Sequence, residues 1–86
     1  MKFNEKFLMD ILREEWDEDL DIEQTDWVLQ GEEEGIAFCD LIFKYNDKYY
    51  KLEYRSDNRV GEYEILSCDC PEVVAEKVIR IEWFEI

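Results

Sequence analysis

The sequence contains no histidine, and this absence excludes every catalytic triad or dyad that relies on an imidazole base. The chain also has no GxGxxG motif and no P-loop pattern for nucleotide phosphates. Ser56 and Ser67 lie in turn-like contexts without an evident base. A chain of 86 residues leaves little room for the cleft that a pair of catalytic carboxylates needs. We therefore expect a protein that is not an enzyme and that holds no cofactor.

Long apolar runs are also missing, since none approaches the ~20 residues of a membrane span, and no signal-peptide pattern opens the chain. The three cysteines, Cys39, Cys68 and Cys70, are an odd number without the C-x₂-C pairs of a structural zinc site. They favour free thiols at core or edge positions in a reducing compartment. The expected location is the cytoplasm.

One metal motif is present only in part. Asp17, Asp19 and Asp21 have the spacing that opens an EF-hand calcium loop. The position that requires glycine is Ile22, however, and the position that requires a bidentate glutamate is Val28. The sequence therefore predicts no metal site.

Basic residues are scarce: ten Lys and Arg stand against 24 Asp and Glu, for a formal net charge of −14. The interval from Glu14 to Phe43 contains no Lys or Arg at all. Its acidic residues are Glu14, Glu15, Asp17, Glu18, Asp19, Asp21, Glu23, Asp26, Glu32, Glu33, Glu34 and Asp40. The rest of the chain is close to charge balance. This acidic block costs self-repulsion in the folded state and calls for an explanation.

The strongest structural pattern is a hairpin over Ala37–Ser56. Asn46 and Asp47 tolerate the positive φ of a type I′ turn. Folding about them pairs Tyr45 with Lys48, Phe43 with Tyr50, Leu41 with Leu52 and Cys39 with Tyr54. One face then carries Ala37, Cys39, Leu41, Phe43, Tyr50, Leu52 and Tyr54, and the other carries Asp40, Ile42, Lys44, Tyr49, Lys51, Glu53 and Arg55. Turn and alternation agree on one register, and the first face is the floor of the core.

The remaining segments flank this hairpin. Asn4 is suited to cap a helix to about Trp16, whose apolar stripe faces the core. The expected elements that follow are an extended or irregular connection over 17–26, a short strand over 27–30, an acidic turn over 31–35, a strand over 62–67, a helical turn or irregular edge over 71–77, and a last strand over 78–86 with Ile79, Ile81 and Trp83 on one face. The predicted fold is a single α+β domain spanning residues 1–86, with the N-terminal helix packed on an antiparallel sheet of four to five strands around a central hairpin.

Two interpretations of the acidic block compete. Solvation explains a high acidic content, but it does not require thirty residues without one lysine. The alternative is that the block presents carboxylates to a basic protein surface that otherwise binds the closely spaced phosphates of nucleic acid. The predicted partner-binding residues are Glu14, Glu15, Asp17, Glu18, Asp19, Asp21, Glu23, Asp26, Glu32, Glu33 and Glu34. Direct binding to nucleic acid or to an anionic membrane is disfavoured, because both would repel this charge.

The acidic run EEWDEDLDIEQTD, the turn GEEEG and the closing CDCPEVVAEKVIRIEWFEI give the chain a wider resemblance. It resembles small acidic proteins of phages and prophages of Gram-positive bacteria, and is similar in kind to anti-CRISPR proteins that mimic DNA. This likeness implies a stoichiometric inhibitor in the host-cell cytoplasm, which occupies the basic channel of a Cas effector or another nuclease. The alternative is an acidic immunity-type, antitoxin-type or structural protein that neutralises a basic partner. Trp83, Phe84 and Ile86 also make the last strand a candidate edge for a homodimer.

Overall fold

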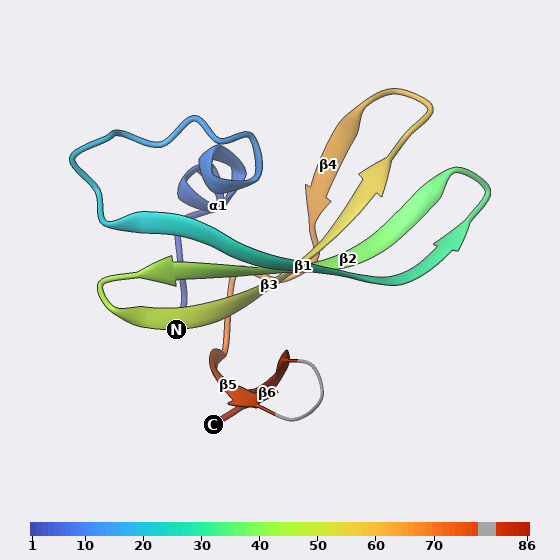
Figure 1. Cartoon of the computed structure of the whole chain (residues 1–86). Helices are drawn as coiled ribbons and strands as arrows, with labels where there is room; N and C mark the ends of the chain where they lie inside the picture. Colours follow the sequence, from blue (N-terminus) through green and yellow to red (C-terminus); the bar gives the residue numbers. More distant parts are fainter. Residues whose placement is uncertain (78–80) are drawn as a thin grey trace.

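The structure is a computed structural model that describes residues 1–77 and 81–86. Within these residues one short helix lies on a curled antiparallel sheet, which confirms the α+β class (Figure 1). The elements are α1 (Glu5–Leu12), β1 (Ile22–Glu33), β2 (Ile36–Tyr45), β3 (Lys48–Asp57), β4 (Glu62–Ile65), β5 (Glu72–Lys77) and β6 (Ile81–Glu85). The described part of the sheet therefore has six strands, where four to five were predicted.

Helix α1 begins where the sequence predicts and ends earlier. The Asn4 side chain accepts a hydrogen bond from the Lys6 backbone N–H at 2.9 Å, which confirms Asn4 as the N-cap. The helix stops at Leu12, four residues before the predicted Trp16, because Glu14 adopts a left-handed φ of 57°. Trp16 still packs against the core from outside the helix. No helix in the described part of the chain is long and apolar enough to cross a membrane.

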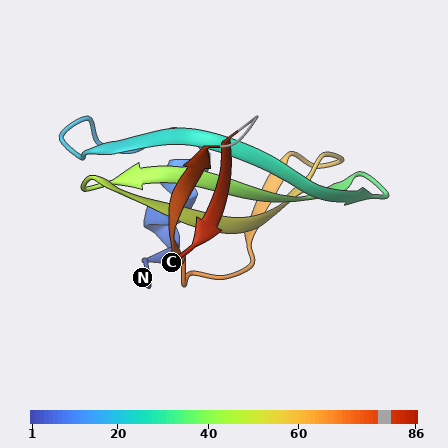
Figure 2. The same ribbon diagram turned by 60° about the horizontal axis from the view of Figure 1, so that its bottom comes forward.

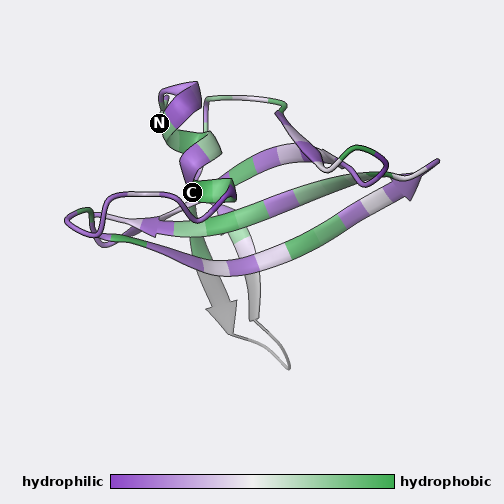
Figure 3. Cartoon of the chain, turned by 90° about the horizontal axis from the view of Figure 1, so that it is seen from above, coloured by the Kyte–Doolittle hydropathy of each residue, from purple (hydrophilic) through white to green (hydrophobic). Residues whose placement is uncertain are grey.

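The central hairpin forms in the predicted register. β2 and β3 pair Tyr45 with Lys48, Phe43 with Tyr50, Leu41 with Leu52 and Cys39 with Tyr54. Asn46 and Asp47 have φ values of 51° and 65°, as a type I′ turn requires. Hydrophilic and hydrophobic residues alternate along the long strands (Figure 3), so the pleat sends one set to each face.

The predicted inner face of this hairpin is the core. Its seven residues are all buried, and Phe43 and Leu52 are fully inaccessible. Leu8 and Ile11 of α1, also fully buried, belong to the same cluster as Leu41 and Leu52. The helix therefore covers this face, as the sequence pattern favours.

Strand β1 is longer than predicted and corrects two expectations. Ile22–Glu33 is one strand along β2, although 17–26 was expected to be a connection and 27–30 a short strand. Charge density favoured an irregular segment, but in a strand successive side chains point to opposite faces, which separates the charges. The register shifts between Gln24 and Asp26 and between Leu29 and Gly31, so β1 carries two irregularities. Such irregularities are typical of edge strands, and β1 is the first strand in the sheet order.

The acidic turn is shorter than the predicted 31–35. Glu34 and Gly35 alone have positive φ values in this segment, 53° and 83°, and they join β1 to β2. Gly31 instead lies in the strand beside the second irregularity. The two glycines therefore have different roles, and only Gly35 needs its conformational freedom.

Replacing Gly35 by alanine should lower the free energy of unfolding by about 1 kcal/mol, because a side chain disfavours left-handed backbone. The added Cβ would lie 3.1 Å from Cγ of Arg59, a flexible side chain, so backbone conformation dominates the loss. Gly31→Ala is the matched control, since no atom lies within 4 Å of its Cβ position. Equal urea midpoints for the two variants would show that the 34–35 turn is wrongly placed.

β3 uses its second edge for two partners. Tyr54–Asp57 pairs with β4, and Tyr49 and Tyr50 pair with the start of β5. The β4 strand confirms the prediction over 62–67 in part, since it ends at Ile65. The prediction of a helical turn or irregular edge over 71–77 is wrong. Residues 72–77 form β5, which pairs with β6. Of the predicted last strand, residues 78–80, including Ile79, lie outside the described residues.

The β5–β6 hairpin lies across the sheet face opposite α1 (Figures 1 and 2). This hairpin explains why Ile42 is buried. The sequence places Ile42 on the outer face, yet its side chain is only 1% exposed. Val73 of β5 is equally buried, and the Trp83 ring of β6 lies 5.1 Å from that of Tyr49. Lys51 donates a hydrogen bond to Glu85 at 3.0 Å, which raises the pKa of Lys51. The sheet is therefore covered on both faces, by a helix on one and a hairpin on the other.

Candidate functional site

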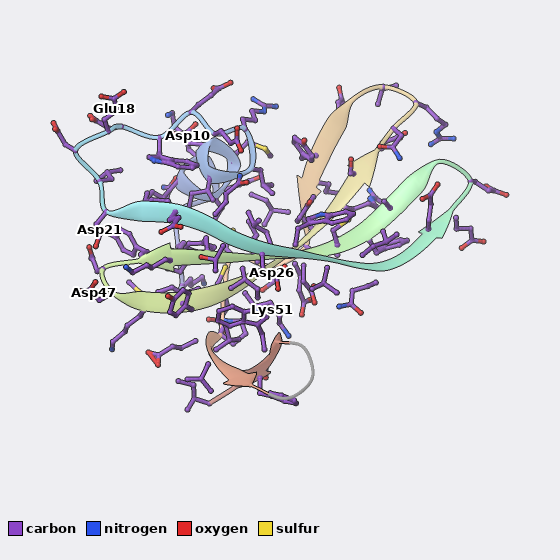
Figure 4. All side chains as sticks on the ribbon, viewed as in Figure 1. Asp10, Glu18, Asp21, Asp26, Asp47 and Lys51 are labelled. Atoms are coloured by element: carbon purple, nitrogen blue, oxygen red, sulfur yellow. The ribbon has the colours of Figure 1, made fainter. Side chains whose placement is uncertain are left out.

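The first part of the acidic block is a loop between α1 and β1 (Figure 4). Its carboxylates, called here the loop acids, are Glu14, Glu15, Asp17, Glu18, Asp19 and Asp21 with Glu23 at the start of β1. All seven are exposed, as a partner-binding role requires. The loop acids are therefore all solvated, from the end of α1 to the start of β1.

The loop is held by backbone hydrogen bonds. The N–H of Glu15 donates to the carbonyl of Asp10 at 2.8 Å, and that of Leu20 donates to Asp17 at 3.0 Å. The Asp17 carboxylate also accepts the backbone N–H of Asp19 at 3.0 Å, a local turn typical of aspartate. Asp17 thus has a structural task in addition to its charge.

The loop acids have a neighbour that lies outside the Glu14–Phe43 interval of the sequence. The N–H of Asn46 donates to the carbonyl of Asp21 at 3.3 Å, so the β2–β3 turn lies against the loop. Figure 4 shows Asp47 of that turn beside Asp21. Pairing of Ile22 with Tyr45 produces this contact, and only knowledge of the full extent of β1 reveals it. Asp47 extends the acidic surface, although Lys44 lies 3.7 Å from its carboxylate.

The second part of the block lies at the other end of β1. Glu32, Glu33 and Glu34, called here the turn acids, are exposed at the β1–β2 turn. At about 3.3 Å per strand residue, roughly 30 Å of β1 separate Glu23 from Glu32. The structure therefore divides the contiguous acidic sequence into two groups at opposite ends of one long strand.

Asp26 lies between the groups and has a different role. Its Oδ1 accepts the Trp27 backbone N–H, and its Oδ2 accepts the indole N–H of Trp83, both at 2.8 Å. The side chain is half-buried and links β1 to β6. Asp26 was predicted among the partner-binding residues, but these two donors fix it in the fold. Its sequence position gives no sign of this contact, because Trp83 is far away in the chain.

Six of the Lys and Arg side chains in the described chain pair with acids outside the loop acids and turn acids. Ion pairs join Lys6 to Asp10, Lys44 to Asp47, Lys48 to Glu72, Lys51 to Glu53 and Glu85, Arg55 to Glu64, Arg59 to Asp57, and the N-terminal amine to Asp69. None of the loop acids or turn acids takes part in an ion pair among the described side chains. Arg13, at the end of α1, is the nearest cation in the sequence. Both acidic groups are therefore exposed and uncompensated.

Three aromatic side chains that are not among the predicted partner-binding residues meet beside the loop acids. The indole N–H of Trp27 donates to the Tyr54 hydroxyl at 2.6 Å, and the Tyr54 and Tyr63 rings lie 5.7 Å apart, edge to face. Tyr54 is buried, and burial raises the pKa of its hydroxyl to about 12. Trp27 lies in the segment expected to be a short strand, and its side chain is 53% exposed. An exposed tryptophan flanked by acidic residues is the signal that marks this place.

The cysteines have the character predicted for core residues. Cys39 and Cys70 are buried and Cys68 is half-buried, all as free thiols. Burial raises the pKa of Cys70 to about 12, which makes its thiol unreactive at neutral pH. No group of three or more potential metal ligands occurs among the described residues.

Comparison of the chain with protein-family models, curated proteins and solved structures found no match. The function therefore has to be inferred from the residues of this chain. Its most distinctive surface is the pair of uncompensated acidic groups on the α1–β1 loop and the β1–β2 turn. Such a surface attracts cations and basic proteins and repels phosphate.

Proposed function

We propose that the protein is a non-catalytic inhibitor that binds the basic nucleic-acid-binding surface of a partner protein. In agreement with the resemblance to anti-CRISPR proteins, the partner proposed is a Cas effector or another nuclease in the host-cell cytoplasm. The observation that carries the proposal is the exposure of ten carboxylates without an ion-pair partner among the described side chains. Solvation alone gives no reason for all ten to lack an ion pair among the described side chains.

The spacing of the two acidic groups supports mimicry of nucleic acid. A separation of roughly 30 Å along β1 equals about nine steps of a duplex, in which each strand carries one phosphate per 3.4 Å. A basic channel that follows a duplex presents Arg and Lys over such a distance. The loop acids and turn acids would contact its two ends, and β1 with the exposed Trp27 would lie between them.

The exposure of the acids also sets the kind of binding expected. Exposed carboxylates steer a basic partner over long range, so association should be fast and strongly weakened by salt. Each contact is worth little alone, and affinity arises from many of them together. The proposal thus predicts a complex that competes with nucleic acid and dissociates as the ionic strength rises.

A pull-down tests this function. The protein is immobilised and exposed to lysate of cells that carry candidate nucleases, then washed at 50 mM and at 500 mM salt, concentrations of about one-third and three times the physiological ionic strength. We expect a Cas effector or other nucleic-acid enzyme to be retained at low salt and lost at high salt. An unrelated protein of similar net charge is the control. Recovery of a small basic toxin would favour the immunity or antitoxin alternative, and retention of no basic protein at either salt would contradict the proposal.

A further inference from the structure

An open groove lies on the helix side of the sheet, between the end of α1, β1 and β4. α1 and β4 lie on the same side of the sheet (Figure 1) and contact each other. Two adjoining hollows, of about 540 and 380 Å³, share the side chains of Trp27, Tyr54 and Tyr63. These three residues therefore line both hollows, which together are called here the groove.

The groove presents aromatic faces and has no unused polar donor on its tryptophan. The indole N–H of Trp27 is taken up by the Tyr54 hydroxyl, yet half of the Trp27 side chain remains exposed. Tyr63 is also exposed, at 37%. Trp27 and Tyr63 therefore offer exposed aromatic surface to a ligand, and such surface attracts apolar groups and cations.

The charged residues at the edge of the groove, called here the rim, favour a cation over an uncharged apolar group. Glu14 and Glu15 line the first hollow and Glu32 lines the second. Arg13 is the one cationic side chain among the lining residues described, so the groove has an excess of carboxylates. An anion is repelled there. A cation gains from the rim and from the rings, whereas an uncharged apolar group gains only from the rings.

We propose that this groove receives an arginine side chain of the basic partner. The inference rests on the proposed function and adds the residue type that the partner inserts. Guanidinium is planar, stacks on aromatic faces and pairs with carboxylate in a bidentate manner, whereas the ammonium of lysine is a compact and strongly hydrated charge. Trp27 and Tyr63 supply the stacking faces, and Glu14, Glu15 or Glu32 supply the carboxylate.

A second copy of this chain is a poor occupant. A copy would bring its own acidic groups to the acidic rim, and like charges across an interface are costly. Two irregularities in β1 also hinder edge-to-edge pairing of copies next to the groove. Charge complementarity therefore selects a basic partner.

Two peptides with the same charge, nine arginines and nine lysines, provide the probe. The ¹⁵N-labelled protein is titrated with each peptide at low salt, and the indole N–H signals of the three tryptophans are followed, with that of Trp27 assigned by its loss in Trp27→Leu. We expect the arginine peptide to shift the Trp27 signal and to bind about three- to thirtyfold more tightly than the lysine peptide.

Two substitutions should abolish this preference without abolishing binding. In Trp27→Leu and in Tyr63→Ala, both peptides should bind with similar Kd. Phe38→Leu is the matched control: Phe38 is an exposed aromatic residue of β2 that does not line the groove, and its loss should leave the preference intact. The wild-type shift of the Trp27 signal is an independent readout if a variant does not fold.

The outcomes separate this inference from the proposed function. If both peptides bind equally and shift only the backbone amide signals of the loop acids, the groove does not bind arginine. The acidic surface would then still bind a basic partner. If neither peptide binds at low salt, the inference and the proposed function both fail. Binding of an uncharged aromatic peptide as tightly as the arginine peptide would also overturn the arginine assignment.

Discussion

Replacing Leu52 by alanine should lower the free energy of unfolding by about 2–5 kcal/mol. Leu52 is fully buried and pairs with Leu41 at the middle of the central hairpin, under α1. Removing one methine and two methyl groups leaves a cavity, because α1 on one side and the strands on the other leave little freedom to collapse. For a domain of this size the total stability is roughly 4–13 kcal/mol, so the loss is a large fraction of it.

Urea unfolding followed by tryptophan fluorescence measures the loss. Leu66→Ala is the matched control, because the same atoms are removed from a side chain that is 48% exposed. Its free energy of unfolding should change by less than about 0.5 kcal/mol. If the two variants have the same midpoint and slope, the hairpin register and the position of α1 are both wrong.

Reversing three loop acids should have the largest effect on binding. The triple variant with lysine at positions 18, 19 and 21 replaces Glu18, Asp19 and Asp21, whose carboxylates make no hydrogen bond or ion pair among the described side chains. Asp17 is retained because its carboxylate accepts the Asp19 backbone N–H and shapes the loop. Affinity for a basic partner should fall about a hundredfold at low salt, or roughly 2.7 kcal/mol, since like charges then face each other.

The control for charge reversal uses exposed glutamates that belong to neither the loop acids nor the turn acids. Lysine at the positions of Glu53, Glu62 and Glu64, on β3 and β4, changes the net charge by the same amount. These glutamates are exposed, and Glu53 and Glu64 form only surface ion pairs, which are worth little. Both triple variants should keep the wild-type far-UV spectrum. Equal loss of binding in the two would mean that net charge alone matters and that the loop acids are not a docking surface.

The part of the fold that the sequence predicts is local. The Asn46–Asp47 turn and the alternation around it specify one register, because a slip by one residue would expose the buried face. Asn4 is equally well marked as a helix cap, since its side chain acts two residues away. These elements need no information from the rest of the chain.

The elements that were missed depend on distant partners. β1 is acidic and has low strand propensity at its start, but ten residue pairs with β2 hold it in the sheet. The segment after Pro71 becomes β5 because Tyr49 and Tyr50 offer it an edge and Ile42 offers it an apolar face. Neither partner is adjacent in the sequence, so periodicity alone gives an irregular edge.

The candidate site was predictable by residue type and not by arrangement. The acidic block is visible in the sequence, and its exposure follows from its charge. Its division into loop acids and turn acids follows from the length of β1. Asp26 differs from both groups because its carboxylate accepts a hydrogen bond from Trp83. The groove at Trp27 depends on the approach of β4, which pairs with the far end of β3.

The central claim is that the loop acids and turn acids occupy a surface that otherwise binds nucleic acid. The most direct test is an equilibrium competition between this protein and a duplex or guide RNA for the partner recovered in the pull-down, repeated at several salt concentrations. We predict mutual exclusion, with the apparent Kd of each ligand rising in proportion to the concentration of the other. Simultaneous binding of protein and nucleic acid to one partner molecule, with no change in either Kd, would contradict the claim.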